Sequence, residues 1–442
     1  RKHSKEIDMQ ASSEYFTPGT IAVRDRQVTA LRSNHVQGVS PVVRGAFYLF
    51  VFSILFEEAA MPIPLEVIHV TGGFLVMAVL FIQPGLGLRR PPAAFWCFVL
   101  YMCVGIGTLL YYQQLFDEEI LAKQFKTFQL VLLFWVTYNL MRHDRTARGA
   151  LISLVASCAL LSVLQVYGLT STTEKVLSKT ARFSAFGLGP GQLAGVLGLG
   201  LLASFGLVYG SKKVAITQRV LIWPVFALIG MTLLKTGSRG PLIALAAGFL
   251  VFTLRKGTLV TKLRNIFFVF LGLGLFLWIA SYSEIVKHRF EATLEDGSMS
   301  ARERIYPNAV QMFFEKPLIG WGPVANTWEL GNRVQIPRYE RMDTHNLILY
   351  VITSTGIMGA IPFFIGVGLC VRAAFKSRGG AHGVLPLAMT ASILVADMSS
   401  SGLHWKQHWL ILAYALASAS FVKSQSVQGV LAAPLSNTTG NA

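Results

Sequence analysis

Residues 343–351 read DTHNLILYV, and they mark the point where a long polar stretch gives way to an apolar one. The polar stretch runs from Ser283 to Thr344. Nine apolar segments precede it and three follow it, most of them close in length to the roughly 17–25 residues of a membrane-crossing helix. Because nine is odd, we expect the polar stretch on the opposite side of the membrane from the N-terminus.

The composition is typical of a helical membrane protein. Of the 442 residues, 53% are hydrophobic and 14% are charged, and the mean hydropathy is +0.53. A soluble domain carries about 25% charged residues. Each span in a bilayer must satisfy its own backbone hydrogen bonds, which favours helices. We therefore expect an all-α polytopic membrane protein, with about twelve transmembrane helices and a helical loop on the outer side between spans nine and ten.

The boundaries of the segments follow the apolar runs. The expected spans are residues 45–60, 66–83, 93–112, 127–141, 149–168, 188–208, 219–234, 240–254, 265–282, 346–375, 384–400 and 406–422. The expected organisation is a cytoplasmic N-terminal segment (1–44), transmembrane helices 1–9 (45–282), an outer loop domain (283–344), which the resemblance described below makes periplasmic, transmembrane helices 10–12 (345–422) and a disordered cytoplasmic tail (423–442). Residues 1–40 show no apolar core of a signal peptide.

The formal net charge of +17 indicates orientation in a membrane rather than nucleic-acid binding. Basic residues gather in alternate loops, such as 142–148 and 255–264, and are fewer in the loops between them. The positive-inside rule places the basic loops and both termini in the cytoplasm, and the 283–344 stretch outside. We expect membrane lipids, and no nucleic acid, as partners of these charges. All four cysteines fall in apolar segments, which argues against a disulfide framework.

Two basic residues depart from this charge pattern on the outer side. Lys235 and Arg239 lie in a tight turn, 234–241, between two spans. One interpretation is that they reach toward lipid phosphates. The other is an anion site, in which the Ser238 hydroxyl, exposed backbone N–H groups and the start of a helix assist, since arginine can bind phosphate oxygens with two hydrogen bonds.

Further arginines lie in two other outer segments. Arg182 precedes the glycine-rich loop 187–191, which is either a plain loop or a close backbone approach to a ligand. Residues 300–314 predict an amphipathic helix that Pro317 ends, with Arg302 and Arg304 near its start. These two arginines are either solvated or part of the same anion site.

His345 is the candidate for proton transfer. Its unperturbed pKa near 6.5 suits a general base at neutral pH, and it stands at the mouth of a span. Asp343 could orient it, and Asn346 follows it directly. A lone histidine here is also compatible with a helix cap or a core position. The outer segments contain no His, Asp or Glu residues at the spacing of metal ligands. The chain also contains no Walker A motif and no GxSxG motif. We therefore expect no metal and no cofactor.

The combination of these segments resembles the O-antigen ligase family of bacterial membrane glycosyltransferases, which also includes O-antigen polymerases and protein O-oligosaccharyltransferases. The resemblance spans roughly residues 180–365. It is carried by Arg182 with its glycine loop, Thr236-Gly237-Ser238-Arg239-Gly240, Ala301-Arg302, Pro317-Leu318-Ile319-Gly320-Trp321-Gly322, His345-Asn346 and Thr355-Gly356-Ile357-Met358-Gly359. One departure is Gly189-Pro190-Gly191, where we expect an Asn-Pro-Asn-like sequence.

The resemblance implies an inverting, metal-independent glycosyltransferase at the periplasmic face of the bacterial inner membrane. The implied donor is an O-antigen glycan on undecaprenyl diphosphate, and the implied acceptor is the lipid A-core oligosaccharide. Cations stabilise a diphosphate leaving group as it gains charge, so they lower the barrier. We expect Arg239 foremost, with Arg182, Lys235, Arg302 or Arg304, to bind the diphosphate, and His345 to take the proton of the acceptor hydroxyl.

Two alternative functions stay open at this point. One is an O-antigen or exopolysaccharide polymerase of the same family, which uses a second lipid-linked glycan as acceptor. The other is a lipid-linked oligosaccharide flippase or a secondary transporter, which favours paired broken helices and ionisable residues at mid-membrane depth. The expected spans are nearly free of such residues.

Overall fold

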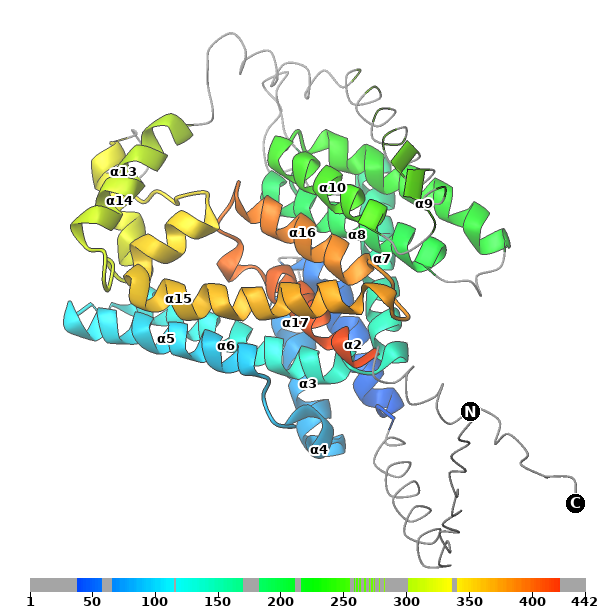
Figure 1. The fold of residues 1–442 in the computed structure, drawn as a ribbon, viewed down its shortest axis with the longest axis horizontal. Coiled ribbons are helices and arrows are strands. Elements are labelled where there is room, and N and C mark those ends of the chain that lie inside the picture. Colours follow the sequence, from blue (N-terminus) through cyan, green and yellow to red (C-terminus); the bar gives the residue numbers. More distant parts are fainter. Residues whose placement is uncertain are drawn as a thin grey trace, which may run out of the picture. The chain divides into compact units, whose positions relative to one another are not determined.

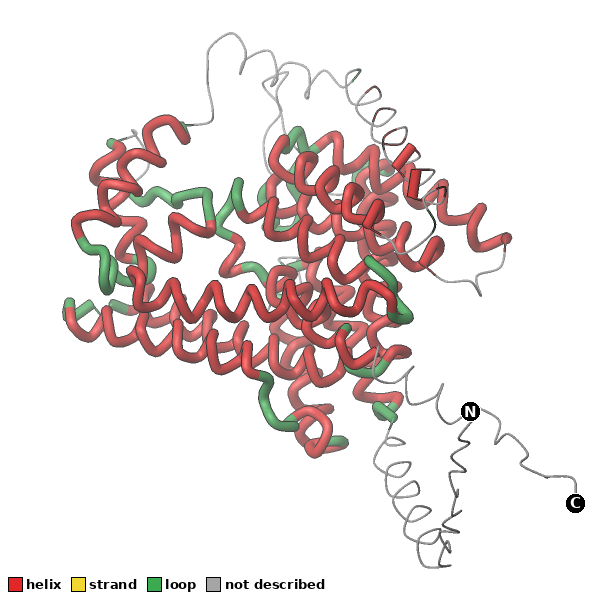
Figure 2. The backbone as a smooth tube through the Cα atoms, viewed as in Figure 1, coloured by secondary structure: helices red, strands yellow, loops and turns green. Residues whose placement is uncertain are grey.

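The computed structural model describes residues 38–57, 66–114, 117–169, 183–210, 216–254, 301–335 and 340–421, with isolated positions between 258 and 282. The regular structure in these ranges is helical, apart from one isolated bridge between Ala185 and Leu188 (Figure 2). The all-α prediction is therefore confirmed. The expected ninth span and residues 283–300 lie essentially outside the described residues, so neither can be compared with the sequence.

Figure 1 labels the longer helices in chain order. The first group is α2 (Pro41–Ser53), η1 (Ile54–Phe56), α3 (Val67–Ile82), α4 (Pro84–Gly87), α5 (Ala93–Tyr111), α6 (Glu118–Met141), α7 (Asp144–Val166), α8 (Pro190–Gly210), α9 (Ile216–Lys235), α10 (Arg239–Val251) and η2 (Phe252–Leu254). The second group is α13 (Arg302–Glu315), α14 (Ala325–Val334), α15 (Leu347–Lys376), η3 (Ser377–Gly379), α16 (Leu385–Asp397), η4 (Gly402–His404) and α17 (Lys406–Ala417).

Four described helices are long and apolar enough to cross a membrane: Ala93–Tyr111, Asp144–Val166, Pro190–Val208 and Leu347–Gly379. Five shorter apolar helices accompany them: Pro41–Phe56, Val67–Ile82, Val220–Lys235, Arg239–Leu254 and Leu385–Asp397. These helices indicate a membrane protein. The number of twelve crossing helices and the boundaries of the expected domains stay predictions.

One boundary differs clearly from the sequence expectation, because α6 begins at Glu118 rather than near residue 127. The Asp117 carboxylate accepts hydrogen bonds from the N–H groups of Glu119 and Ile120, which caps the helix. Acidic residues in the first turn also interact favourably with the positive end of a helix. Capping therefore extends this helix several residues beyond its apolar run.

An aromatic core joins α5, α6, α15 and α17. The Phe98 ring lies 5.2 Å from Phe134, 5.7 Å from Phe363 and 5.0 Å from Trp409, measured between ring centroids. All four side chains are fully buried. Figure 1 shows α5 and α15 side by side, with α13 and α14 near one end of the pair. This core therefore fixes the helix that follows His345.

The expected span 346–375 is not one continuous helix, because α15 is broken at Gly356. This residue has φ +59° and ψ −162°, which no helix accommodates. Loop 317–322 binds the backbone groups that the break leaves unpaired. Ile357 N–H donates to Pro317 O at 2.8 Å, and Trp321 N–H donates to Thr353 O at 2.8 Å. Buried backbone groups need such partners, so the loop and the break stabilise each other.

Glycine is required on both sides of this junction. A Cβ on Gly356 would collide with the Leu318 carbonyl, and a Cβ on Gly320 would lie 2.7 Å from the Gly356 nitrogen. Both glycines have positive φ, which disfavours any residue with a side chain. The glycine spacing in 317–322 and 355–359 therefore reflects a backbone interlock.

The polar segment before α15 contains α13 and α14, so it is helical where it is described. The core between α13 and α14 includes Ile305, Ala309, Met312, Leu330 and Val334. Val310 and Phe314, which belong to the predicted amphipathic helix 300–314, are exposed. They face away from the packed side of α13, since the buried residues at 305, 309 and 312 occupy the other face.

Candidate active site

A loop between α16 and α17, residues 398–405, connects several of the sequence-predicted residues. It includes three consecutive serines beginning at Ser399, and we call it the serine loop. The Ser399 carbonyl accepts a hydrogen bond from Arg302 Nη2 at 2.8 Å. The Ser401 hydroxyl donates to Asp343 Oδ2 at 2.5 Å. An arginine of the polar segment and the Asp-Thr-His-Asn sequence are therefore anchored to the same loop.

His345 adopts an unusual backbone conformation just before α15. Its φ of +49° lies in the left-handed region, which few residues other than glycine adopt. Its N–H donates to Asp343 Oδ1 at 3.3 Å, and Thr344 Oγ1 donates to Asn346 O at 3.0 Å. Asn346 caps α15 by accepting from two N–H groups of the first turn. Strained residues of this kind cluster at functional sites.

The His345 imidazole is accessible and lies near a carboxylate. Its side chain is 45% exposed, and Nδ1 lies 3.8 Å from Asp343 Oδ2. This distance is too long for a hydrogen bond, but a small movement would form one. With Nδ1 facing Asp343, the Nε2 atom is available to accept a proton from a substrate.

α13 presents Arg302 and Tyr306 to the serine loop, and Arg304 to solvent. Tyr306 donates from its hydroxyl toward Met398 O at 3.4 Å and His345 O at 3.5 Å. Arg302 and Tyr306 are four residues apart, so they lie on one face of the helix. Arg304 is exposed and lies about 200° around the helix from Arg302. The structure therefore brings Arg302, and not Arg304, to this site.

The turn between α9 and α10 packs against the serine loop. A Cβ on Gly240 would collide with the Ser399 hydroxyl, so the Ser399 side chain packs directly against the Gly240 backbone. Lys235, at the end of α9, is exposed, and Arg239, at the start of α10, is half-buried. Ser238 is only 5% exposed, which leaves its hydroxyl less open to a ligand than the sequence suggested. Lys235 and Arg239 thus lie at the end of the bundle to which Arg302 is anchored.

Arg182 lies outside the described residues, but the chain next to it meets the same turn. The Phe183 N–H donates to the Lys235 carbonyl at 3.1 Å. The Phe186 ring lies 5.1 Å from that of Phe56, between centroids. The loop after Arg182 is therefore attached to the end of α9.

Sequence reasoning missed the polar residues of the serine loop and of the first turn of α17. His404 Nε2 lies 3.1 Å from the Tyr350 hydroxyl, and burial lowers the pKa of His404 to about 4. His408 Nδ1 lies 2.6 Å from Asp397 Oδ2, and both of these side chains are fully buried. The sequence held no clear signal for them, because Ser399 and Ser400 fall within the expected span 384–400, and the extended residue Trp405 separates His404 from the helix that carries His408.

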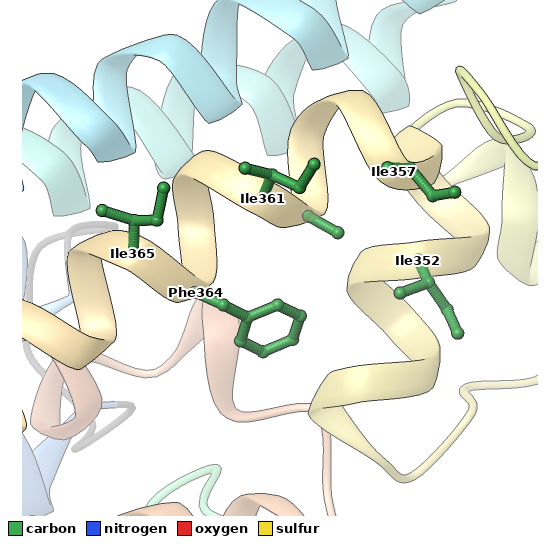
Figure 3. Close-up of a pocket in the computed structure, with 6 residues that line it drawn as sticks. Ile352, Ile357, Ile361, Phe364 and Ile365 are labelled. Carbon is green, nitrogen blue, oxygen red and sulfur yellow. The ribbon is translucent and has the colours of Figure 1, made fainter.

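An apolar groove of about 500 Å³ lies along α15 beside the break at Gly356 (Figure 3). Its lining residues are Ile352, Ile357, Ala360, Ile361, Phe364 and Ile365. Ile352 precedes the break and the others follow it, so the change of helix direction shapes the groove. The lining suits an apolar chain and offers nothing to a charged headgroup.

No group of three or more His, Cys, Asp or Glu side chains in the described ranges could hold a metal ion. The expectations of a metal-independent reaction and of no cofactor stay predictions. The chemical groups present are an accessible imidazole beside a carboxylate and several basic side chains at the same end of the bundle. Such a set can accept a proton and stabilise an anionic leaving group.

The chain was compared with known protein families. Residues 224–364 match the family described as O-antigen ligase. The matched range includes the turn before α10, α13, loop 317–322, His345 and the break in α15, and it excludes Arg182 and the serine loop. A search of curated proteins found no match.

Proposed function

We propose a function from the premise that this chain belongs to the O-antigen ligase family, whose domain spans residues 224–364. The family indicates a glycosyl transfer of the O-antigen ligase or polymerase type, with lipid-linked glycans as substrates in a membrane. The finer proposal is an inverting, metal-independent transfer of an O-antigen glycan from undecaprenyl diphosphate to the lipid A-core oligosaccharide. We assign the reaction to the periplasmic face of the bacterial inner membrane.

The observation that carries this proposal is the shared anchoring of the basic and imidazole groups on the serine loop. Arg302 binds the Ser399 carbonyl, Ser401 binds Asp343, and Asp343 accepts from the His345 backbone. The first two of these contacts join residues that are 97 and 58 positions apart in the sequence. They support a single site that contains both a proton acceptor and cations.

In the proposed reaction the acceptor hydroxyl attacks the anomeric carbon of the donor sugar. The bond from that carbon to the diphosphate oxygen breaks, and the leaving diphosphate keeps the electron pair. Arg239, Lys235 and Arg302, with Arg182 as a further member, stabilise the charge that develops on it. His345 Nε2 takes the proton of the acceptor hydroxyl, and Asp343 stabilises the imidazolium. Attack from the face opposite the diphosphate inverts the anomeric configuration.

The groove on α15 supports a lipid-linked donor. It lies on the helix that begins two residues after His345, and it has an entirely apolar lining. An isoprenoid chain placed there would leave its diphosphate near the polar end of the bundle. The apolar groove would therefore hold the lipid and the basic side chains its headgroup.

The break in α15 bears on the transporter alternative, because broken membrane-spanning helices also form the substrate sites of transporters. In this protein loop 317–322 binds the free backbone groups of the break. The break is therefore filled by protein, and its backbone groups are not available to a transported substrate. This observation favours a transferase over a flippase or a secondary transporter.

The test is transfer by the purified protein from an undecaprenyl-diphosphate glycan, with two acceptors offered separately. Glycan attached to lipid A-core indicates the ligase. A lengthened lipid-linked glycan indicates the polymerase instead. No product with either acceptor, together with glycolipid movement across vesicle membranes, would contradict the transferase proposal and support a transporter.

A further inference from the structure

The serine loop lies outside residues 224–364, the range that matches the family. Its Ser401 side chain contacts Asp343, which lies beside the proposed base His345. We propose that Ser401 is a positioning residue for His345, acting through Asp343, and that the Asp397–His408 pair holds the loop that carries Ser401. This inference rests on the proposed role of His345 as the general base.

The Asp343 carboxylate is fixed at both oxygens. Oδ1 accepts the N–H of His345 at 3.3 Å, and Oδ2 accepts the Ser401 hydroxyl at 2.5 Å. A carboxylate held at both oxygens has little freedom to rotate. Oδ2 therefore stays 3.8 Å from His345 Nδ1, where a small closure on substrate binding would complete the hydrogen bond.

This arrangement affects the chemistry through the orientation of the imidazole. A carboxylate near Nδ1 favours the tautomer that carries its proton on Nδ1 and leaves Nε2 free to accept another. It also stabilises the positive charge that appears on the ring during proton transfer. Ser401 touches no reacting atom, so its effect must pass through Asp343.

The Asp397–His408 pair joins the two ends of the serine loop. Asp397 is the last residue of α16, and His408 belongs to the first turn of α17. Their side chains are fully buried, with Nδ1 2.6 Å from Oδ2. Gly402 packs so tightly on this carboxylate that a Cβ would collide with Oδ1. The loop is therefore folded around the Asp397 side chain, and Gly402, which packs on that side chain, directly follows Ser401.

The same loop also anchors the segments on either side of the base. The Met398 carbonyl accepts from Asn346 Nδ2 at 3.5 Å and lies 3.4 Å from the Tyr306 hydroxyl. The Ser399 carbonyl accepts from Arg302. A shift of the loop would therefore move His345 relative to the basic groups. Reactions of this kind are sensitive to displacements of about 1 Å.

The primary test compares Ser401→Ala with the matched control Ser400→Ala in the purified full-length protein. Among the residues that the structure describes, the Ser400 hydroxyl bonds only to Ala396 O, at 3.1 Å, near the end of α16. With the undecaprenyl-diphosphate glycan as donor, we expect Ser401→Ala to lower kcat about tenfold, the rate equivalent of one hydrogen bond to a charged group lost in the transition state. The donor KM should stay unchanged, and Ser400→Ala should behave like the wild type.

A double-mutant cycle with Asp343→Asn separates positioning from a general structural effect. If Ser401 acts through Asp343, Ser401→Ala adds little once Asp343 is changed. Ser401→Thr, which keeps the hydroxyl, should recover most of the lost kcat. Fully additive losses, or an unchanged kcat for Ser401→Ala in an active wild-type background, would overturn the role of Ser401. A wild type without transfer to either acceptor would instead overturn the proposed function, and this role with it.

The Asp397–His408 pair is tested with the same double-mutant cycle of Ser401 and Asp343. We expect Asp397→Asn to reduce the energetic coupling between Ser401 and Asp343 and to lower kcat without changing the donor KM. If this variant does not fold, His408→Phe, which fills a similar volume but cannot bond to Asp397, replaces it. Undiminished coupling in a folded variant would remove the pair from the proposal.

Discussion

Arg302 and Arg304 differ in what surrounds them, although one residue separates them on α13. The Arg302 guanidinium reaches the Ser399 carbonyl, and its Nε is buried without a hydrogen-bond partner among the described residues. Arg304 is exposed to solvent. A guanidinium held by one nitrogen keeps its other N–H groups oriented for an anionic ligand.

We expect Arg302→Ala to lower kcat/KM for the lipid-linked donor by about 10- to 100-fold, the range for losing a hydrogen bond between charged groups. Arg304→Ala is the matched control, and its kcat/KM should stay within about twofold of the wild type. The measurement is initial-rate kinetics at varied donor concentration. Equal losses in the two variants would contradict the assignment of Arg302 to the site.

His404 is expected to make stability depend on pH. Burial holds its pKa at about 4 in the folded protein, against about 6.5 in an unfolded chain. The unfolded chain therefore binds the proton more strongly. Stability is fully present above pH 6.5 and is lost as the pH falls toward 4, by at most about 3 kcal/mol.

The corresponding measurement is thermal unfolding of the purified protein in detergent between pH 7.5 and pH 4.5. The wild type should lose stability across this range, and His404→Gln should lose less over the same interval. A His404→Gln variant with the full wild-type pH dependence would show that other groups cause the effect.

At the scale of elements, the interlock between loop 317–322 and the break in α15 connects the polar segment to the bundle. Gly322 N–H donates to Ser354 O at 2.9 Å, and Met358 N–H donates to Leu318 O at 3.1 Å. Thr108 of α5 also donates to Ile319 O at 3.0 Å. The hydrogen bonds of loop 317–322 therefore orient the start of α15 and His345, which precedes it.

Gly356→Ala should destabilise the fold by about 2 kcal/mol or more, because an alanine in this glycine-specific backbone conformation costs about 1–3 kcal/mol and its Cβ meets the Leu318 carbonyl. Gly368→Ala is the control on the same helix. Its Cβ would enter open space, so we expect unchanged or slightly raised stability. Melting temperatures of the two variants in detergent give the comparison. A Gly356→Ala variant as stable as Gly368→Ala would contradict the interlock.

The sequence predicted the helices better than it predicted the contacts between distant segments. Apolar runs identified most of the helices, because burial in lipid leaves a local signal. The interlock joins Gly320 to Gly356 and was visible only as two glycine motifs, since backbone pairing between distant segments has no periodicity. Ser401 carried no signal of its own, because a serine between two spans is ordinary until its partner is known. Ser238, expected to face a ligand, is buried by packing that no local pattern reveals.

At the scale of the whole molecule, the basic residues proposed for the diphosphate and His345 belong to one end of the helical bundle. α10 and α15 begin there, and α9 and α16 end there, as the contacts around Ser399 require. The proposed orientation places this end in the periplasm, and η3, after α15, in the cytoplasm.

Labelling of single cysteines tests this orientation. In a background without the four native cysteines, Glu303→Cys and Lys376→Cys place a thiol at exposed positions near opposite ends of α15. A membrane-impermeant maleimide added to spheroplasts should label Glu303→Cys, and should label Lys376→Cys only after permeabilisation. The reverse pattern would place the site in the cytoplasm.

The account as a whole depends on the chemical role of His345, and its most direct test is the glycan-transfer rate of His345→Ala. Removal of a general base should lower the rate about 10²- to 10⁴-fold. Binding of the undecaprenyl-diphosphate donor and the melting temperature should stay close to the wild-type values, because the imidazole is nearly half exposed. A folded His345→Ala protein that transfers glycan at close to the wild-type rate would contradict the account.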